Sequence, residues 1–414
     1  MNQTISSILH NRVYVLLLVV VFVMHLAGFL ITPIFPILLK KDLTFSLTQI
    51  GLVLGVENIV YLAGSLLGGM LADTYGRRSV MVTGALTQAA AMLGFGISQT
   101  FWLFVLFAAL NGFGLGFIAP ALKAMITDSV TVEQRTSAFS IRGIAAHSGI
   151  ILAGITLSWF AAVNQRLFFF SSLLFVLLAL IVRITLREER KENTKQPIPL
   201  TQYKMLFYHR SFLLFSLITL LIWAFYAQFG LALPLRVENV LGSANSIGFI
   251  WTINSLSVLL LQGGISRFLL LRLNPYLSLL LGTLMLGVGI VGLGWSDRFA
   301  FLSASAVVFI IGEMILLPVL DSLTSYFAKD DLLGIYFGFA NFIAGIGSAV
   351  GTSLGGWLIE RLGGVGNSAP WVAFGLMTVL ILALLGIFAI YAVPKYQRTP
   401  PTTPITIVRR EKAE

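Results

Sequence analysis

Residues 13–39 read VYVLLLVVVFVMHLAGFLITPIFPILL and contain no lysine, arginine, aspartate or glutamate. A helix needs about 20 apolar residues to cross the hydrocarbon core of a bilayer, whereas the apolar part of a secretory signal peptide has only about 7–15. The stretch therefore predicts a first membrane-spanning helix and not a cleaved signal peptide.

The composition of the whole chain agrees with this first span. Of the 414 residues, 57% are hydrophobic and only 11% are charged, whereas a soluble domain usually carries about 25% charged residues. This balance excludes a soluble enzyme, a nucleic-acid-binding protein and a disordered chain. The absence of cysteine excludes disulfides and thiolate metal sites. No metal-ligand spacing and no phosphate-binding glycine loop followed by lysine is visible, so we expect no cofactor, no use of ATP and no enzymatic activity.

Eleven further apolar stretches follow the first, and a polar stretch divides the twelve into two groups of six. The predicted spans are 13–39, 48–72, 79–97, 101–127, 136–162, 167–186, 211–234, 245–270, 275–295, 299–327, 333–361 and 370–393. Residues 187–210 are too polar to enter lipid. We therefore expect an N-terminal six-helix bundle over 1–186, a cytoplasmic linker over 187–210, a C-terminal six-helix bundle over 211–393 and a cytoplasmic tail over 394–414.

The basic residues predict the orientation of the chain. With the N-terminus in the cytoplasm, six of the 27 lysines and arginines fall on outer segments, and the other 21 fall on inner ones. Basic residues collect on the cytoplasmic side of membrane proteins. Both termini and the linker are thus expected in the cytoplasm of a multi-pass cell-membrane protein, and the net charge of +10 requires no nucleic-acid partner. The six outer residues are Lys40, Lys41, Arg166, Arg236, Arg298 and Arg361.

The two groups of six also share an internal repeat. Glycine, proline and tryptophan positions recur at an offset of 198 residues: Pro36 and Pro234, Gly84 and Gly282, Gly114 and Gly312, Pro120 and Pro318, Gly149 and Gly347, Trp159 and Trp357. An even number of spans separates the copies, so both halves have the same orientation. The predicted fold class is an all-α membrane protein with 12 transmembrane helices in two parallel six-helix bundles around a central cavity, an arrangement found in secondary transporters.

The loop after the second span carries a family motif. It reads Gly69-Met-Leu-Ala-Asp73-Thr-Tyr-Gly76-Arg77-Arg78 and resembles the loop signature of the major facilitator superfamily. The resemblance implies two six-helix bundles around a cavity that opens alternately to each side, and bacterial multidrug-efflux members are the most similar overall. Two features depart from the drug:proton antiporters of that family. Ala108 stands where they usually carry an arginine, and the fifth span has no proline.

The same loop supplies candidate gating residues. Opposite charges in a confined loop can form a charge-assisted contact that holds in one conformation and breaks in another. The expected members are Gly69, Asp73, Gly76, Arg77 and Arg78, with Asp128 added by the resemblance. The alternative is that the two arginines only determine topology. The repeat also aligns Lys123 with Asp321, which could pair across the cavity, although Lys123 could equally reach the inner membrane surface.

Five ionisable residues are expected at lipid depth, where they are costly and often functional. They are His25, Glu57, His147, Glu313 and Asp321. In the family, spans 1, 4, 7 and 10 line the cavity, which would place three of them near the transport path. Glu313 is the first candidate for proton coupling, with Glu57, Asp321 and His25 behind it. The alternative for each is a buried polar group that is hydrogen-bonded to a neighbouring helix.

Aromatic and amide side chains complete the expected substrate site. Stacking and cation–π contacts favour flat or cationic amphiphiles. The candidate substrate-binding residues are His25, Tyr61, Asn111, Trp223, Tyr226, Gln228, Asn254 and Glu313.

Together these features predict a monomeric secondary active transporter that exports small amphipathic compounds in exchange for protons by alternating access. Its partners would be a small-molecule substrate, protons and membrane lipid. The alternatives are a transporter of one metabolite or metallophore, and a non-transporting receptor or scramblase on the same fold.

Overall fold

The computed structural model describes residues 7–131, 134–159, 166–186, 209–243, 245–270, 272–327 and 333–396. Within these ranges the regular structure is entirely helical, with no strand. Twelve of the helices are long and apolar enough to cross a membrane. The predicted all-α class and the predicted number of spans are therefore confirmed.

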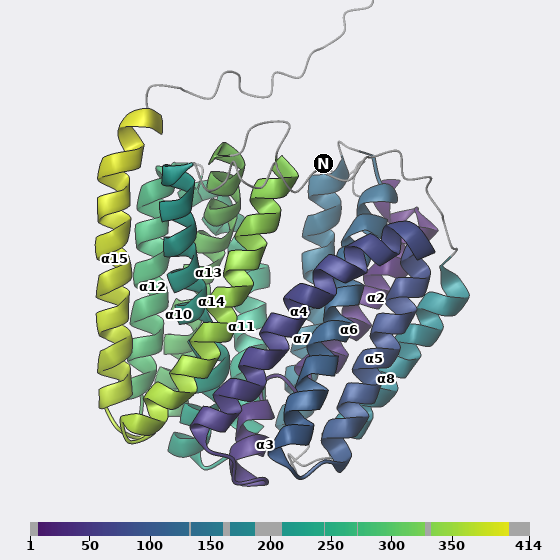
Figure 1. Ribbon diagram of the computed structural model, residues 1–414, viewed down its shortest axis with the longest axis horizontal. Helices are drawn as coiled ribbons and strands as arrows, with labels where there is room; N and C mark the ends of the chain where they lie inside the picture. The colour runs from purple at the N-terminus through teal and green to yellow at the C-terminus, as the bar shows by residue number, and fades with distance from the viewer. Residues whose placement is uncertain are drawn as a thin grey trace, which may run out of the picture.

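The helices form two groups that stand side by side (Figure 1). The N-terminal half contains α2 (Arg12–Phe29), α3 (Phe35–Lys41), α4 (Leu47–Tyr75), α5 (Arg77–Ile97), α6 (Phe101–Asp128), α7 (Arg135–Trp159) and α8 (Arg166–Thr185). The C-terminal half contains α10 (Arg210–Leu241), α11 (Asn245–Gly264) with the π-helix η3 (Ile265–Leu270), α12 (Pro275–Trp295), α13 (Phe299–Phe327), α14 (Leu333–Arg361) and α15 (Ala369–Tyr396).

Several helices begin at a side chain that caps their free backbone N–H groups. The Asn11 side chain accepts hydrogen bonds from the backbone N–H groups of Val13 and Tyr14 at the start of α2. Ser46 and Gln49 form a reciprocal capping box at the start of α4. These caps fix where each helix enters the apolar layer.

The first predicted span is not one continuous helix, which corrects the prediction over 13–39. The helix α2 ends at Phe29, a short turn follows, and α3 begins at Phe35. Pro33 lacks a backbone N–H, so it donates no hydrogen bond to the Phe29 carbonyl and the helical ladder is interrupted there. The backbone N–H and the hydroxyl of Thr32 both donate to the Gly28 carbonyl, each at 3.0 Å. The turn places a bend of the first span beside the centre of the molecule.

Other prolines do not interrupt their helices, and one predicted boundary is wrong for that reason. Pro234 was expected to end the seventh span, but it lies inside α10, which continues to Leu241. Pro120 and Pro318 likewise lie inside α6 and α13. Proline is tolerated within membrane helices because neighbouring groups take up the freed carbonyl. Residues 160–162 of the predicted fifth span, 187–208 of the linker and 397–414 of the tail lie outside the described residues.

The repeat at an offset of 198 corresponds to equivalent helix crossings in the two halves. A Cβ added at Gly84 would lie 2.7 Å from the Gly114 carbonyl oxygen, and one at Gly282 would lie 3.2 Å from the Gly312 carbonyl oxygen. The third and fourth spans of each half therefore cross backbone to backbone at the paired glycines. Gly149 packs on the Phe22 carbonyl of α2, as Gly347 packs on α10.

The two halves meet along two helix pairs, α4 with α14 and α7 with α11, which we call the seams. A Cβ at Gly51 would lie 3.2 Å from the Cα atom of Gly356, and a Cβ at Gly154 would lie 2.6 Å from the Gly248 carbonyl oxygen. Both contacts lie at the same end of the molecule, the first toward the start of α4 and the end of α14, and the second toward the end of α7 and the start of α11. That end of the molecule is opposite the one that carries the N-terminus (Figure 1), and we call it the far side. The halves are thus closed together at the far side.

One carboxylate joins the halves at that closed end. A Glu360 carboxylate oxygen at the end of α14 accepts a hydrogen bond of 2.7 Å from the backbone N–H of Thr48, in the first turn of α4. A helix in one half therefore receives part of its N-terminal cap from the other half. Lys41 and Glu238 add an exposed ion pair at 3.9 Å on the same side.

Candidate functional site

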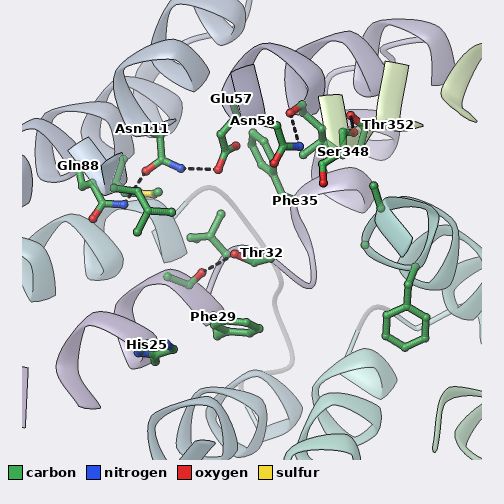
Figure 2. Close-up of a pocket in the computed structure, with 18 of the residues that line it drawn as sticks. His25, Phe29, Thr32, Phe35, Glu57, Asn58, Gln88, Asn111, Ser348 and Thr352 are labelled. Carbon is green, nitrogen blue, oxygen red and sulfur yellow. Dashed lines mark hydrogen bonds between the residues drawn. The ribbon is translucent and has the colours of Figure 1, made fainter. Parts of the chain in front are cut away.

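A cavity of about 450 Å³ lies between the two halves. This volume is within the range of sites that bind drug-sized ligands, about 300–1,000 Å³. Both halves contribute to its wall (Figure 2). Its polar or aromatic lining residues are His25, Phe29, Thr32, Phe35, Glu57, Asn58, Gln88, Phe95, Asn111, Phe175, Trp223, Tyr226, Phe229, Trp251, Ser348 and Thr352.

A chain of hydrogen bonds forms the polar wall of the cavity. The Gln88 side-chain amide donates to the Asn111 Oδ1 atom at 3.1 Å, and the Asn111 Nδ2 atom donates to a Glu57 carboxylate oxygen at 2.9 Å. Figure 2 shows this chain running from α5 through α6 to α4. Gln88 and Asn111 are almost completely buried, with 4% and 8% of their surface exposed. Because Gln88 occupies the Asn111 oxygen, the Asn111 amide is oriented to donate to Glu57.

Glycines bring α4 and α6 close enough for this contact. A Cβ at Gly116 would lie 2.6 Å from the backbone of Gly64, and a Cβ at Gly64 would lie 2.8 Å from the Phe113 carbonyl oxygen. At Gly112 the two backbones touch beside the Glu57 carbonyl. Small residues permit such close helix packing in membranes. The short Asn111 side chain can therefore reach across to Glu57.

Aromatic side chains form the opposite wall. The Trp223 and Tyr226 rings of α10 lie 5.2 Å apart, and the Phe229 and Trp251 rings lie 5.9 Å apart. Phe29 of the N-terminal half meets Trp251 of the C-terminal half at 5.4 Å, so the aromatic wall crosses between the halves. Aromatic pairs at these distances stabilise the wall and present flat faces to a ligand.

Charge in the cavity wall is sparse. Among the described lining residues Glu57 is the only acid, and none is lysine or arginine. His25 contributes an imidazole whose Nδ1 atom is 2.8 Å from the Val21 carbonyl oxygen and whose ring stacks on Phe29 with centroids 6.4 Å apart. The cavity therefore combines one carboxylate, one imidazole and a set of amides with a mostly aromatic surface.

The predicted substrate and coupling residues divide into two sets. His25, Glu57, Asn111, Trp223 and Tyr226 line the cavity. The remaining five, Tyr61, Gln228, Asn254, Glu313 and Asp321, are not among its lining residues.

The second set occupies positions behind or below the cavity wall. Glu313 lies behind Tyr226, whose hydroxyl is within hydrogen-bonding reach of the carboxylate. The Gln228 amide donates to the Gly351 carbonyl at 2.6 Å and so joins α10 to α14. Asn254 is 1% exposed. Asp321 is exposed on the side of the termini, and His147, on α7, is not among the lining residues.

The gating candidates gather on the side of the termini. Arg77 forms an ion pair with Asp128, and Arg78 donates to the Leu186 carbonyl at 3.3 Å. Gly76 has a φ of 96°, a conformation that favours glycine, and so allows the sharp turn between α4 and α5. The side chain of Asp73 lies outside the described residues, and a Cβ at Gly69 would meet nothing within 4 Å.

Lys123 and Asp321 both lie on the side of the termini but do not form an ion pair with each other. Both are exposed, and each alters the electrostatic environment of the other. In the described part of the chain they make no ion pair. The contact predicted from the repeat is thus absent in this conformation.

Sequence reasoning missed several residues of the site. Gln88 is the only amide side chain in the predicted span 79–97, and that isolation was a usable signal. Arg142 lies within the predicted span 136–162, so its charge at lipid depth was also visible. Ser348 and Thr352 gave no such signal, because small hydroxyl residues are common in membrane helices.

These features define a multi-pass membrane protein of the transporter class: twelve spanning helices, two repeated halves and a ligand-sized cavity at their interface. The sequence profile of the Major Facilitator Superfamily matches residues 17–296. The chain belongs to this family.

Curated relatives support the same class. Multidrug resistance protein MdtH of Salmonella typhimurium (strain LT2) is 25% identical over 363 residues, which cover 87% of this chain and 90% of the relative. MdtH of Salmonella schwarzengrund is equally similar, with the same identity and coverage.

Solved structures share the fold at low sequence identity. A mutant of the nucleoside transporter NupG superposes with a TM-score of 0.82 at 14% identity, covering 91% of this chain and 100% of that chain. A POT family transporter in complex with 5-aminolevulinic acid gives 0.75 at 16% identity, covering 93% and 96%. A bacterial homologue of the lysosomal transporter Spinster, in an inward-facing and occupied conformation, gives 0.71 at 14% identity, covering 95% and 99%.

Proposed function

We propose that the protein is a proton-coupled exporter of small amphipathic compounds that works by alternating access. The observation that carries the proposal is the pairing of a single carboxylate, Glu57, with an aromatic wall in one cavity between the halves. The names of the curated relatives, multidrug resistance proteins, support an amphipathic cargo.

Glu57 would couple the proton to the cargo by competition. The ionised carboxylate accepts from Asn111 and leaves its second oxygen available for the cationic group of a cargo. A protonated carboxyl has no charge with which to hold that group. Proton and cargo thus exclude each other at one site, and such exclusion is what antiport requires. Glu313, joined to the cavity through Tyr226, would be a second proton site.

The closed side and the distribution of basic residues together support an orientation for this conformation. In the sequence, six basic residues fall on the predicted outer segments and 21 on the predicted inner ones, which supports placing the termini in the cytoplasm. The far side would then face outward, and this conformation would be open toward the cytoplasm. The Arg77–Asp128 pair would hold the cytoplasmic loop in the present state and rearrange when the cavity turns outward.

Transport by carboxyl variants tests the proposal. We expect proteoliposomes with wild-type protein to accumulate a cationic dye such as ethidium when a pH gradient is imposed. Glu57→Gln should bind the dye more weakly and lose gradient-driven accumulation, because a glutamine has no charge to hold the cation and cannot exchange a proton. Glu313→Gln should lower the pH dependence and leave the dye affinity unchanged, since Glu313 does not line the cavity.

The matched control is Asp297→Asn, which removes a carboxylate that is exposed beyond the end of α12. It should transport like the wild type. Unchanged gradient-driven transport in Glu57→Gln, in protein that remains folded in detergent, would contradict the proposed role of this residue.

A transporter of one polar metabolite is the second candidate. Three amide side chains, Asn58, Gln88 and Asn111, line the cavity and could recognise a cargo rich in hydroxyl or amide groups. Two of the fold neighbours are a nucleoside transporter and a POT family transporter. A thermal-stability screen separates the candidates, because stabilisation by one nucleoside or peptide alone would favour the second.

A further inference from the structure

Arg142 is a cation at lipid depth that the proposed cycle does not use. It lies on α7, and its Nε atom is buried with no hydrogen-bond partner. Charged side chains within membrane helices are costly and are usually paired. An arginine in this position therefore calls for a counter-charge.

The surroundings of Arg142 supply no such counter-charge in the described part of the chain. The groups close enough to interact with it electrostatically are Tyr61, His25 and Lys123. Two of these are bases and the third is a phenol. Lys123 is near Asp321 without contacting it, and no carboxylate is among the neighbours that influence Arg142.

The position of this basic group relative to Glu57 is fixed by α4. Tyr61, which lies beside Arg142, is one helical turn from Glu57 on the same face of α4, and that spacing separates side chains by about 5–6 Å. His25 both lines the cavity and lies within reach of Arg142. Arg142 is thus next to the cavity, but it is not among the groups that influence Glu57 electrostatically.

We propose that Arg142, assisted by Lys123, binds a carboxylate of the transported compound. A cargo in the cavity would then meet the Glu57 carboxylate and, past Tyr61, the Arg142 guanidinium, which lies next to the cavity but is not among its lining residues. The preferred cargo is an aromatic zwitterion whose amine and carboxylate are separated by a rigid spacer longer than one helical turn, because Arg142 lies past Tyr61. This assignment rests on the proposed function and narrows its cargo class.

A pair of ligands that differ in one charge tests the assignment. Para-aminomethylbenzoic acid carries an amine and a carboxylate across one ring, and its methyl ester lacks the anion. Dissociation constants are measured by calorimetry on the purified full-length protein in a nonionic detergent near neutral pH. We expect Arg142→Gln to weaken binding of the acid about tenfold or more and binding of the ester less than twofold.

Further variants make the result specific. Lys123→Gln should weaken acid binding to a smaller extent, and Arg142→Lys should retain part of it, since a lysine keeps the charge without the planar fork. Arg183→Gln removes an exposed cation of the same half, at the end of α8, and should change neither constant. Melting curves in detergent establish that each variant is folded, and Lys123→Gln keeps the test valid if Arg142→Gln does not fold.

The outcomes separate this inference from the proposed function. Equal weakening of both ligands by Arg142→Gln, or of neither, overturns the carboxylate site and leaves the exporter proposal intact. Wild-type protein that binds neither the acid nor the ester contradicts the proposed cargo class itself. An added arm contains the anionic lipid phosphatidylglycerol. If that lipid abolishes the difference between the effects of Arg142→Gln on acid binding and on ester binding, Arg142 binds lipid phosphate and the cargo assignment is wrong.

Discussion

Arg236 lies near the far end of α10 with only 9% of its surface exposed, and four backbone carbonyls surround its guanidinium. It donates to the carbonyls of Leu293, Gly294, Ser296 and Val365 at 2.8–3.2 Å, and it lies over the Trp371 ring at 5.8 Å. The planar fork of arginine suits several acceptors at once. The residue therefore ties α10 to the end of α12 and to the loop that follows α14.

Removal of this arginine should destabilise the protein without touching the cavity. Arg236→Gln leaves several buried carbonyls without a donor, at a cost of about 2 kcal/mol or more. We expect a lower melting temperature in detergent and unchanged ligand affinity in the surviving folded protein. Arg298→Gln removes an exposed neighbour, 78% of whose side chain is accessible, and should melt like the wild type. Equal melting of both variants would show that the carbonyl contacts contribute little.

At this scale the sequence predicts the depth of a side chain better than its direction. His25 was expected in the cavity and lines it, and Glu57, predicted only as a proton-coupling residue, lines it too. Asn254 and Glu313 were also expected in the cavity but are not among its lining residues. Residue counting along a helix gives depth at a fixed rise per residue. The direction of the side chain depends on how neighbouring helices pack, as the close approach of α4 to α6 shows for Asn111.

The seams are the elements that would separate if the far side opened. In both seams, glycines hold the helices at backbone contact, and the Glu360 carboxylate caps the first turn of α4 from the other half. A capping contact of this kind contributes about 1 kcal/mol. The cap exists only while α4 and α14 are together, so it stabilises the closed far side selectively.

Glu360→Ala should therefore shift the resting population toward an open far side by about fivefold. The chain contains no cysteine, so one introduced thiol reports on accessibility without background. Thr32→Cys, at the cavity wall, should react faster with a membrane-impermeant thiol reagent applied to the far side when Glu360→Ala is also present. Asp297→Ala, a carboxylate outside the seams, is the control. An unchanged reaction rate would exclude a role of the cap in closure.

Element boundaries were predictable where hydrophobic length alone decides them. The predicted spans 275–295 and 299–327 match α12 and α13, because charged or polar residues bound both. The break of the first span after Phe29 was not predicted. The stretch stays apolar through the turn, and only the backbone chemistry of Pro33 marks it. Composition indicates where lipid ends, whereas a bend within lipid depends on hydrogen bonding.

Across the whole molecule, opposite ends should cross-link in opposite states. A cysteine pair at Thr48 and Glu360 bridges the halves on the far side, and a pair at Lys123 and Asp321 faces the side of the termini. In the resting protein we expect a short bifunctional thiol reagent to join only the first pair, and to stop transport. The second pair should react during turnover with cargo and a pH gradient. The cross-linking of each pair is measured by electrophoretic mobility after the chain is cut by a protease between the halves. Cross-linking of both pairs in the same resting protein would contradict alternating access.

The overall architecture was largely predictable, because twelve apolar stretches and a repeat at one offset determine the number and direction of the helices. The contacts at Gly84 with Gly114, and at Gly282 with Gly312, show why the repeat was visible: equivalent crossings require small residues at equivalent positions. The cavity was not predictable in shape, since its wall depends on how far the two halves have turned relative to each other.

The glycine seams have a consequence for the speed of the cycle. Long side chains lose rotational freedom when a surface is covered, at a cost of up to about 2 kcal/mol each, whereas glycine has none to lose. Helices that meet at glycines can associate and separate without the loss and recovery of side-chain conformational entropy at those positions. We therefore expect side-chain ordering at these glycines to add little to the barrier between the two conformations, so that turnover should depend on the fluidity of the bilayer.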